Sequence, residues 1–284
     1  MDFSVSHHRK LFSGTKVFRG SSHRCVYRLT PQIRDGLVEA LQKKVGSSDE
    51  AKLTKFSLKI VFVVKDLVYK IKSRGGNQDH KKDLLSPHQK VPFLELQVYA
   101  SEDHVLDIDS LPSPRLLSTH IPYPSLPTSL IDSGCSIVYI WRDPKAFECF
   151  CNGYSIFGPY WDHVLGYWNA KKNGANILLI KYEDLMVDPV AQLKILAEFL
   201  KLPFTEEEEE DNIIHGIITA CSFQMVKDSK MYESGNTELL QVQVNNTTFL
   251  RERKTNDWEN YLILKMAERL NLITVQRFAD TDLI

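Results

Sequence analysis

Four segments between Arg115 and Leu185 decide the fold: RLLSTHIPY (115–123), SIVYIWRDPK (136–145), GPYWDHVLGYW (158–168) and NILLIKYEDL (176–185). Three of them contain a short apolar run that ends on a polar residue, namely His120, Arg142 and Tyr182. In an open parallel α/β sheet, ligands bind just beyond the carboxyl ends of the strands. We therefore expect an imidazole, a guanidinium and a phenol to meet at one edge of a parallel sheet.

Strands that alternate with helices along the chain are typical of βαβ units and a mostly parallel sheet. We predict strands at 115–119, 136–140 and 177–180, and an aromatic helix at 159–170. The apolar run at 58–69 fits either a strand or a buried helix, because periodicity alone does not separate the two.

The clearest helix signal is the pair Asp188 and Pro189, a typical N-cap followed by a first-turn proline. The apolar residues that follow at helical spacing predict one buried face: Val190, Leu193, Leu196, Ala197 and Leu200. Elsewhere we predict helices at 31–44, 213–220 and 258–270, and a helix start at the acidic run 206–210. We predict loops at 73–87 and 235–248, and little regular structure at 1–30.

The composition favours one α/β domain, 1–284, because 284 residues with 43% hydrophobic content can build one sizeable core. The net charge of −1 hides an asymmetry, since residues 1–90 hold 19 Lys and Arg against 8 Asp and Glu, a balance of +11. A basic arm of this kind can bind nucleic acid or an anionic surface. The basic residues form no helical stripe and no nucleic-acid module, so we predict a solvated basic region and not a nucleic-acid site.

Five cysteines in a chain of this size indicate free thiols, because Cys149 and Cys151 have no second Cys or His pair at zinc spacing. We therefore predict no metal. The first twenty residues lack a long apolar run, and no apolar run reaches membrane-spanning length. A cytoplasmic protein without a membrane partner is expected. The sequence neither supports nor excludes a homodimer.

Several long segments resemble one family, and they occur in the family's order: LPSPRLLSTHIPYPSLPTSL (111–130), DSGCSIVYIWRDPK (132–145), FGPYWDHVLGYW (157–168), LLIKYEDLMVDPVAQLKILAEFL (178–200) and NDWENYL (256–262). They resemble the plant-type cytosolic sulfotransferases of the flavonol sulfotransferase-like kind. The resemblance covers 84–284, whereas 1–50 matches weakly. It implies a P-loop-like nucleotide-binding fold with a central, mostly parallel sheet flanked by helices.

The resemblance also implies a reaction, the transfer of a sulfuryl group from 3′-phosphoadenylyl sulfate (PAPS) to a hydroxyl of a small phenolic, flavonoid-like or steroid-like acceptor. His120 matches the family's general base. An imidazole titrates near neutrality, and a positioned base contributes roughly 10²–10⁴-fold to rate. Without the resemblance, a structural histidine at a strand end would explain His120 equally well.

The residues implied for the nucleotide are spread over the second half of the chain. Arg142 would hold the 3′-phosphate through two parallel hydrogen bonds, although an ion pair with Asp143 is an alternative. Tyr182 matches the tyrosine at the adenine end, and Ser222 matches a small hydroxyl residue beside the nucleotide. A packed tyrosine at a strand exit would explain Tyr182 equally well.

A second clamp on the 3′-phosphate is implied at Arg251, Glu252 and Arg253, where the family has Arg-Lys-Gly. Here an anion replaces the lysine and an arginine replaces the glycine. At an effective dielectric constant near 20, two like charges about 4 Å apart repel by about 4 kcal/mol. Glu252 therefore weakens this clamp unless Arg253 compensates.

Two further departures concern the donor. The family's Pro-Lys-Ser-Gly-Thr-Thr-Trp loop, which would cradle the 5′-phosphosulfate, has its best counterpart at 51–57, where only Lys52 agrees. A helix-sized segment that carries a 3′-phosphate serine in the family is missing after Lys145, and the sheet is predicted to lack one strand.

Three hypotheses therefore remain open. The first is a working sulfotransferase with a weakened donor site, in which Lys52 is a poor substitute for the loop lysine. The second is a catalytically impaired relative without donor binding, and the third is a basic-arm binder of anions or nucleic acid.

Overall fold

The structure is a computed structural model that describes residues 12–19, 22–29, 63–74, 85–98, 111, 113–126, 128–141, 159–222, 235–239, 242–245 and 264–284. The predicted helix at 31–44 lies outside these ranges. The same is true of five predicted site residues, namely Lys52, Arg142, Arg251, Glu252 and Arg253. Among the described residues, no helix is long and apolar enough to cross a membrane.

The centre of the described fold is a βαβ unit. Strand β3 (Ile137–Trp141) pairs in parallel with β4 (Ile177–Lys181), and helix α8 (Tyr160–Lys172) lies between them in sequence. Trp141 lies opposite Lys181, so the carboxyl ends of both strands meet at one edge of the sheet. These elements confirm the predicted strands at 136–140 and 177–180 and the predicted aromatic helix.

Helix α10 (Pro189–Phe199) begins where the sequence predicts, and the reason is local. The side chain of Asp188 accepts a hydrogen bond from the backbone N–H of Ala191 at 3.0 Å, which satisfies one of the amides that a helix start leaves without a partner. Leu193, Leu196 and Ala197 are fully buried, as the spacing predicts. The short helix α9 (Tyr182–Val187) precedes α10 directly.

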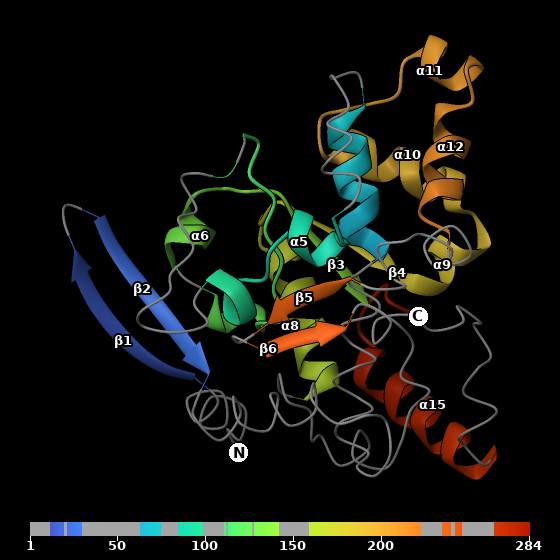
Figure 1. Ribbon diagram of the computed structural model, residues 1–284. Helices are drawn as coiled ribbons and strands as arrows, with labels where there is room; N and C mark the ends of the chain where they lie inside the picture. The colour runs from blue at the N-terminus through green and yellow to red at the C-terminus, as the bar shows by residue number, and fades with distance from the viewer. Residues whose placement is uncertain are drawn as a thin grey trace.

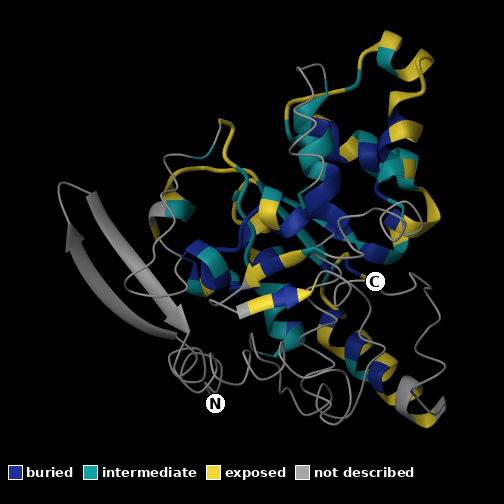
Figure 2. Cartoon of the chain, viewed as in Figure 1, coloured by how far each residue is buried: buried dark blue, intermediate teal, exposed yellow. Residues whose placement is uncertain are grey.

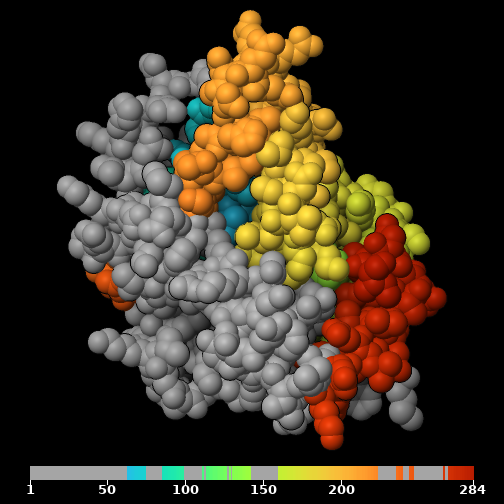
Figure 3. Space-filling view, turned by 90° about the vertical axis from the view of Figure 1, so that its right-hand side faces the viewer, coloured from blue at the N-terminus to red at the C-terminus, as the bar shows by residue number. Residues whose placement is uncertain are grey.

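One hydrophobic core joins α10 and β4 to the helix at 63–73, so the described part of the run left open as strand or buried helix, residues 63–69, is a helix. The other members include Leu67, Ile71 and two residues of helix α12 (Ile213–Ala220), Ile214 and Ile217. Helix α11 (Glu206–Glu210) lies between α10 and α12 in sequence and is capped by Thr205. Figure 3 shows the segment from α9 to α12, in yellow to orange, as a continuous surface.

A second core lies between α8 and the C-terminal helix α15 (Leu264–Phe278), and it contains Trp141, Trp161 and Phe278. The indole N–H of Trp161 donates to the hydroxyl of Thr274 at 3.1 Å. The described part of the helix predicted at 258–270, residues 264–270, is helical, and the helix continues to Phe278 with Leu270, Thr274 and Phe278 buried. Figure 2 shows the alternation of buried and exposed residues along α15.

Two regions predicted to be irregular form antiparallel hairpins (Figure 1). Strands β1 (Phe12–Arg19) and β2 (Ser22–Leu29) pair within the basic region, and β5 (Asn236–Leu239) pairs with β6 (Val242–Asn245). The loop prediction at 235–248 is wrong because Thr237 and Val244 are both buried, a tertiary contact that a polar, Asn-rich sequence does not reveal.

The predicted strand at 115–119 is reduced to a single parallel β-bridge between Phe93 and Ser118. The segment that precedes it forms the short helix α5 (Pro87–Lys90) and a π-helix, η1 (Leu94–Val98). After the bridge in sequence, the chain continues through the 3₁₀-helix η3 (Tyr123–Ser125) to α6 (Thr128–Asp132). This bridge carries the candidate active site.

Candidate active site

The bridge between Phe93 and Ser118 sets the register of the site. The N–H of Leu94 donates to the carbonyl of Ser118 at 2.8 Å, and the N–H of Ser118 donates to the carbonyl of Pro92 at 2.9 Å. Two residues further along each segment lie Glu95 and His120. The backbone pairing therefore brings a carboxylate and an imidazole together from positions 25 residues apart in the chain.

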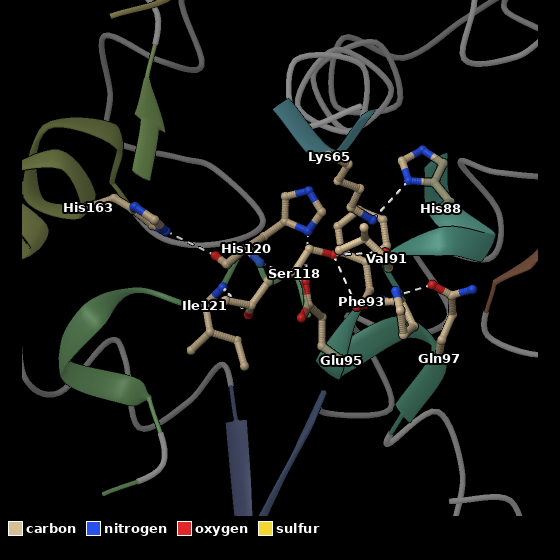
Figure 4. Close-up of polar contacts among 12 residues, drawn as sticks. Lys65, His88, Val91, Phe93, Glu95, Gln97, Ser118, His120, Ile121 and His163 are labelled. Carbon is tan, nitrogen blue, oxygen red and sulfur yellow. Dashed lines mark hydrogen bonds and ion pairs between the residues drawn. The ribbon is translucent and has the colours of Figure 1, made fainter. Parts of the chain in front are cut away.

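His120 is buried, with 6% of its surface exposed, and two groups hold its ring (Figure 4). Nδ1 lies 2.7 Å from Oε1 of Glu95, and the same oxygen accepts the backbone N–H of His120 at 2.8 Å. The ring of Phe93 stacks on the imidazole with centroids 4.7 Å apart. Burial raises the pKa of Glu95, but its hydrogen bonds and its charge interaction with His120 together outweigh burial and hold that pKa below its ordinary value.

Helix α8 fixes the backbone at this histidine and at the residue that follows it. The hydroxyl of Tyr167 donates to the carbonyl of Ile121 at 2.7 Å, and Nε2 of His163 donates to the carbonyl of His120 at 3.0 Å. Nδ1 of His163 lies 2.9 Å from the hydroxyl of Tyr139, whose ring stacks on Tyr167 at 4.2 Å. Burial raises the pKa of Tyr139 well above its usual value, so its hydroxyl keeps its proton and donates.

A second pair of ionisable groups lies on the other side of Phe93. Nζ of Lys65, on the buried helix at 63–73, lies 3.2 Å from the ring centroid of Phe93 and 3.0 Å from Nδ1 of His88. An amine above the ring centre and an imidazole stacked on the same ring cannot share one face without overlap. Phe93 therefore separates Lys65 from His120, as Figure 4 shows.

Burial lowers the pKa of Lys65 well below its ordinary value, although the nearby Glu95 acts in the opposite direction. Burial, with the neighbouring Lys65 and His120, also lowers the pKa of His88. In the unfolded chain Lys65 binds a proton up to about pH 10. The unfolded state thus binds more protons in the window between the two pKa values of Lys65, and there the free energy of unfolding rises with pH.

We predict that Lys65→Met removes this contribution. The slope of unfolding free energy against pH is expected to fall by up to about 1.4 kcal/mol per pH unit in the window that ends near pH 10, which corresponds to one proton. Denaturant unfolding at pH 7, 8 and 9 measures the slope. The exposed Lys265 on α15 provides the matched control, Lys265→Met, which should leave the slope unchanged. An unchanged slope in Lys65→Met would show that Lys65 is charged in the folded protein.

The structure describes two of the predicted nucleotide residues, and both lie on elements other than those that hold His120. Tyr182 is buried at the start of α9, directly after β4. Ser222 is half-buried just after α12. Its neighbour Cys221 donates from Sγ to Oδ2 of Asp66 at 3.3 Å, and Lys90 pairs with the other oxygen of Asp66 at 3.4 Å.

Sequence reasoning did not identify Glu95 or Lys65. The available signal was a charge inside an apolar run, in PFLEL for Glu95 and in VFVVKDLVY for Lys65. Such residues need a buried partner. In the described part of the chain, no group of three His, Cys, Asp or Glu residues could hold a metal ion.

Comparisons with known proteins identify the family to which the chain belongs. The family described as "Sulfotransferase domain" matches residues 62–147 and 145–282. Cytosolic sulfotransferase 16 of Arabidopsis thaliana is 36% identical over 78% of this chain and 73% of its own length. Flavonol 4′-sulfotransferase of Flaveria chlorifolia is 31% identical over 88% of this chain and 85% of its own length.

Solved structures show the same fold. A sulfotransferase-family protein of Arabidopsis thaliana, 27% identical, covers 96% of this chain and 92% of its own, with a TM-score of 0.60. Mouse sulfotransferase SULT7A1, complexed with PAP, is 25% identical, covers 62% of this chain and 70% of its own, and has a TM-score of 0.50.

The chain therefore belongs to the sulfotransferase family. Its fold is the family's α/β fold with a parallel sheet, as the sequence predicts. The family match begins at residue 62, after Lys52, and it is divided at 145–147, next to the position after Lys145 where the resemblance implies a missing segment.

Proposed function

We propose that this protein transfers a sulfuryl group from PAPS to a hydroxyl of a small acceptor, with His120 as the general base. The observation that carries the proposal is the placement of His120. Its imidazole is buried at the end of the parallel bridge, against a carboxylate and an aromatic ring, in a chain of the sulfotransferase family. A neutral imidazole held in one orientation is suited to proton removal near neutral pH.

In the proposed step, the acceptor oxygen attacks the sulfur of PAPS while His120 takes the hydroxyl proton. A new oxygen–sulfur bond forms, and the bond between sulfur and the phosphate oxygen breaks. The leaving group is 3′-phosphoadenosine 5′-phosphate (PAP). His120 ends the step as an imidazolium, and the proton then passes to solvent after the products leave.

The donor would be bound at the carboxyl edge of the sheet. Tyr182 follows β4 at this edge, and Arg142 follows the last residue of β3 in sequence. We propose that Arg142 binds the 3′-phosphate with Arg251 and Arg253, although Glu252 opposes it electrostatically. We propose that Tyr182 and Ser222 contact the nucleoside, and that Lys52 lies at the phosphosulfate.

The named relatives suggest the setting and the acceptor. One is named cytosolic and one is named for a flavonol, so we propose a cytosolic enzyme that acts on a phenolic, flavonoid-like or steroid-like small molecule. No membrane or nucleic acid is required by this function. Whether two copies of the chain associate is independent of it.

A second candidate is a sulfotransferase relative that no longer binds the donor. The family match favours it in one respect, because the match begins after the counterpart of the donor loop and divides where a segment is missing. The two candidates share the fold and His120, and they differ in affinity for the nucleotide.

Nucleotide binding is thus the experiment that separates them. Calorimetric titration of the protein with PAP is expected to give a dissociation constant in the micromolar range. In Arg142→Ala, we expect binding to weaken about 10- to 100-fold, because a charge-assisted hydrogen bond contributes about 1.5–3 kcal/mol. A folded protein that shows no heat of binding would exclude the enzyme and support the second candidate.

A further inference from the structure

The contacts of His120 assign a role to Glu95 that the family match does not supply. Oε1 of Glu95 accepts two hydrogen bonds from the same residue, one from the backbone N–H of His120 at 2.8 Å and one from Nδ1 at 2.7 Å. The carboxylate therefore restrains both the main chain and the ring. Its side chain has no exposed surface, so water does not compete for these bonds.

The ionisation state of Glu95 determines which nitrogen of His120 carries the proton. Burial raises the pKa of Glu95, but its hydrogen bonds and its charge interaction with His120 together hold the pKa below its ordinary value, so the group is a carboxylate and can only accept hydrogen bonds. Nδ1 must then carry hydrogen. A neutral imidazole with hydrogen on Nδ1 has its lone pair on Nε2, the nitrogen on the side of the ring away from Glu95.

The hydrogen bonds that the carboxylate of Glu95 accepts come from His120. Its second oxygen, Oε2, has no hydrogen-bond partner in the described part of the chain, although it is buried. A buried carboxylate that is only half satisfied is costly, and it gains most when an adjacent imidazole becomes positively charged. Proton removal by His120 creates this positive charge.

The backbone makes the pair rigid. The bridge at Phe93 and Ser118 fixes the register, and the N–H of Phe93 donates to the side-chain oxygen of Gln97 at 2.8 Å, which closes the first turn of the π-helix η1. Single π-helical turns are frequent at functional sites. Glu95, on that turn, is thereby held at the distance that the two hydrogen bonds require.

We propose that Glu95 is the positioning residue of a Glu95–His120 pair: it fixes the Nδ1–H tautomer of His120 and stabilises the imidazolium that forms during transfer. This proposal rests on the proposed function for its role in catalysis, whereas the tautomer and the orientation can be tested without activity.

The test uses Glu95→Gln in the full-length protein. The amide oxygen of the introduced side chain can accept the same two hydrogen bonds, so the substitution removes the charge and keeps the shape. We expect kcat to fall about 10- to 100-fold, because no carboxylate then stabilises the imidazolium that forms during transfer. The matched control is Glu198→Gln at an exposed position of α10, which should leave kcat unchanged.

A second measurement is independent of catalysis. Long-range ¹⁵N–¹H NMR spectra distinguish the two tautomers of a histidine, and comparison with His120→Asn assigns the signal of His120. The proposal predicts an Nδ1–H tautomer of His120 in the native protein. An Nε2–H tautomer, or an unchanged kcat in a folded Glu95→Gln protein, would overturn it. If the spectra agree while the native protein transfers no sulfuryl group, the proposed function fails and the pairing stands.

Discussion

Replacement of His120 by Asn is expected to lower kcat/KM for sulfuryl transfer by about 10²- to 10⁴-fold, the usual contribution of a positioned general base. The amide nitrogen of Asn is as many bonds from Cβ as Nδ1 is, so it can keep the hydrogen bond to Glu95, which spans 2.7 Å in the native protein. Nothing then occupies the position of Nε2. The substitution thus removes the base, and the buried carboxylate of Glu95 still accepts a hydrogen bond. Initial rates with saturating PAPS and varied acceptor measure the effect.

The same exchange at a surface histidine is the control. His215 is exposed on α12, and His215→Asn should leave kcat/KM within about twofold of the native value. PAP binding should be the same in His120→Asn and in the native protein. A folded His120→Asn protein that binds PAP and retains full activity would show that another group removes the proton.

The parts of the fold that could be predicted from sequence are those specified locally. Asp188 and Pro189 start α10 because a cap side chain and a fixed backbone angle act within one turn of the helix. Strand β3 is an apolar run of five residues and β4 is an apolar run of four residues that ends on Lys181, and the two pair in parallel because the connection between them contains α8. In each case the signal that decides the element, a cap or an apolar run, lies within one short segment, even though Ile137 pairs with the distant Ile177.

The partners of His120 could not be predicted in this way. Glu95 is 25 residues away from it, and the two meet only because a one-residue bridge sets the register of two irregular segments. The charge in an apolar run is visible, but a sequence does not tell which buried group will compensate it. Lys65 is a similar case, since its partner His88 lies 23 residues further along the chain.

The hairpin β5–β6 could not be predicted for a different reason, because its composition argues for a loop. The hydroxyl oxygen of Thr237 lies 2.8 Å from that of Ser86, so the hairpin is tied to the segment that leads into α5. Thr237 and Val244 point inward while their neighbours Asn236, Glu238, Gln243 and Asn245 are exposed. Strand propensity depends strongly on such packing, and here packing overrides an Asn-rich sequence.

The largest expected effect on stability comes from the core that joins α10 to the helix carrying Lys65. Leu193 is completely buried, and it lies in one cluster with Leu67 and Ile71 of that helix and with Ile180 of β4. Leu193→Ala is expected to lower the free energy of unfolding by about 2–5 kcal/mol, because the substitution removes buried methyl groups and leaves a cavity. Urea unfolding followed by tryptophan fluorescence measures the change.

A substitution of a second large aliphatic residue on the same helix distinguishes the effect of lost packing on stability from the effect of changed helix propensity. Ile195 is 44% exposed, so Ile195→Ala removes a similar side chain from α10 without opening a cavity, and it should cost less than about 1 kcal/mol. If the two variants lose equal stability, α10 does not pack on the helix at 63–73. If only Leu193→Ala is destabilised, this core also supports the helix that places Lys65 against Phe93, and Phe93 stacks on His120. Loosening the core is then expected to disturb the orientation of the base at a distance, so kcat should fall before the protein unfolds.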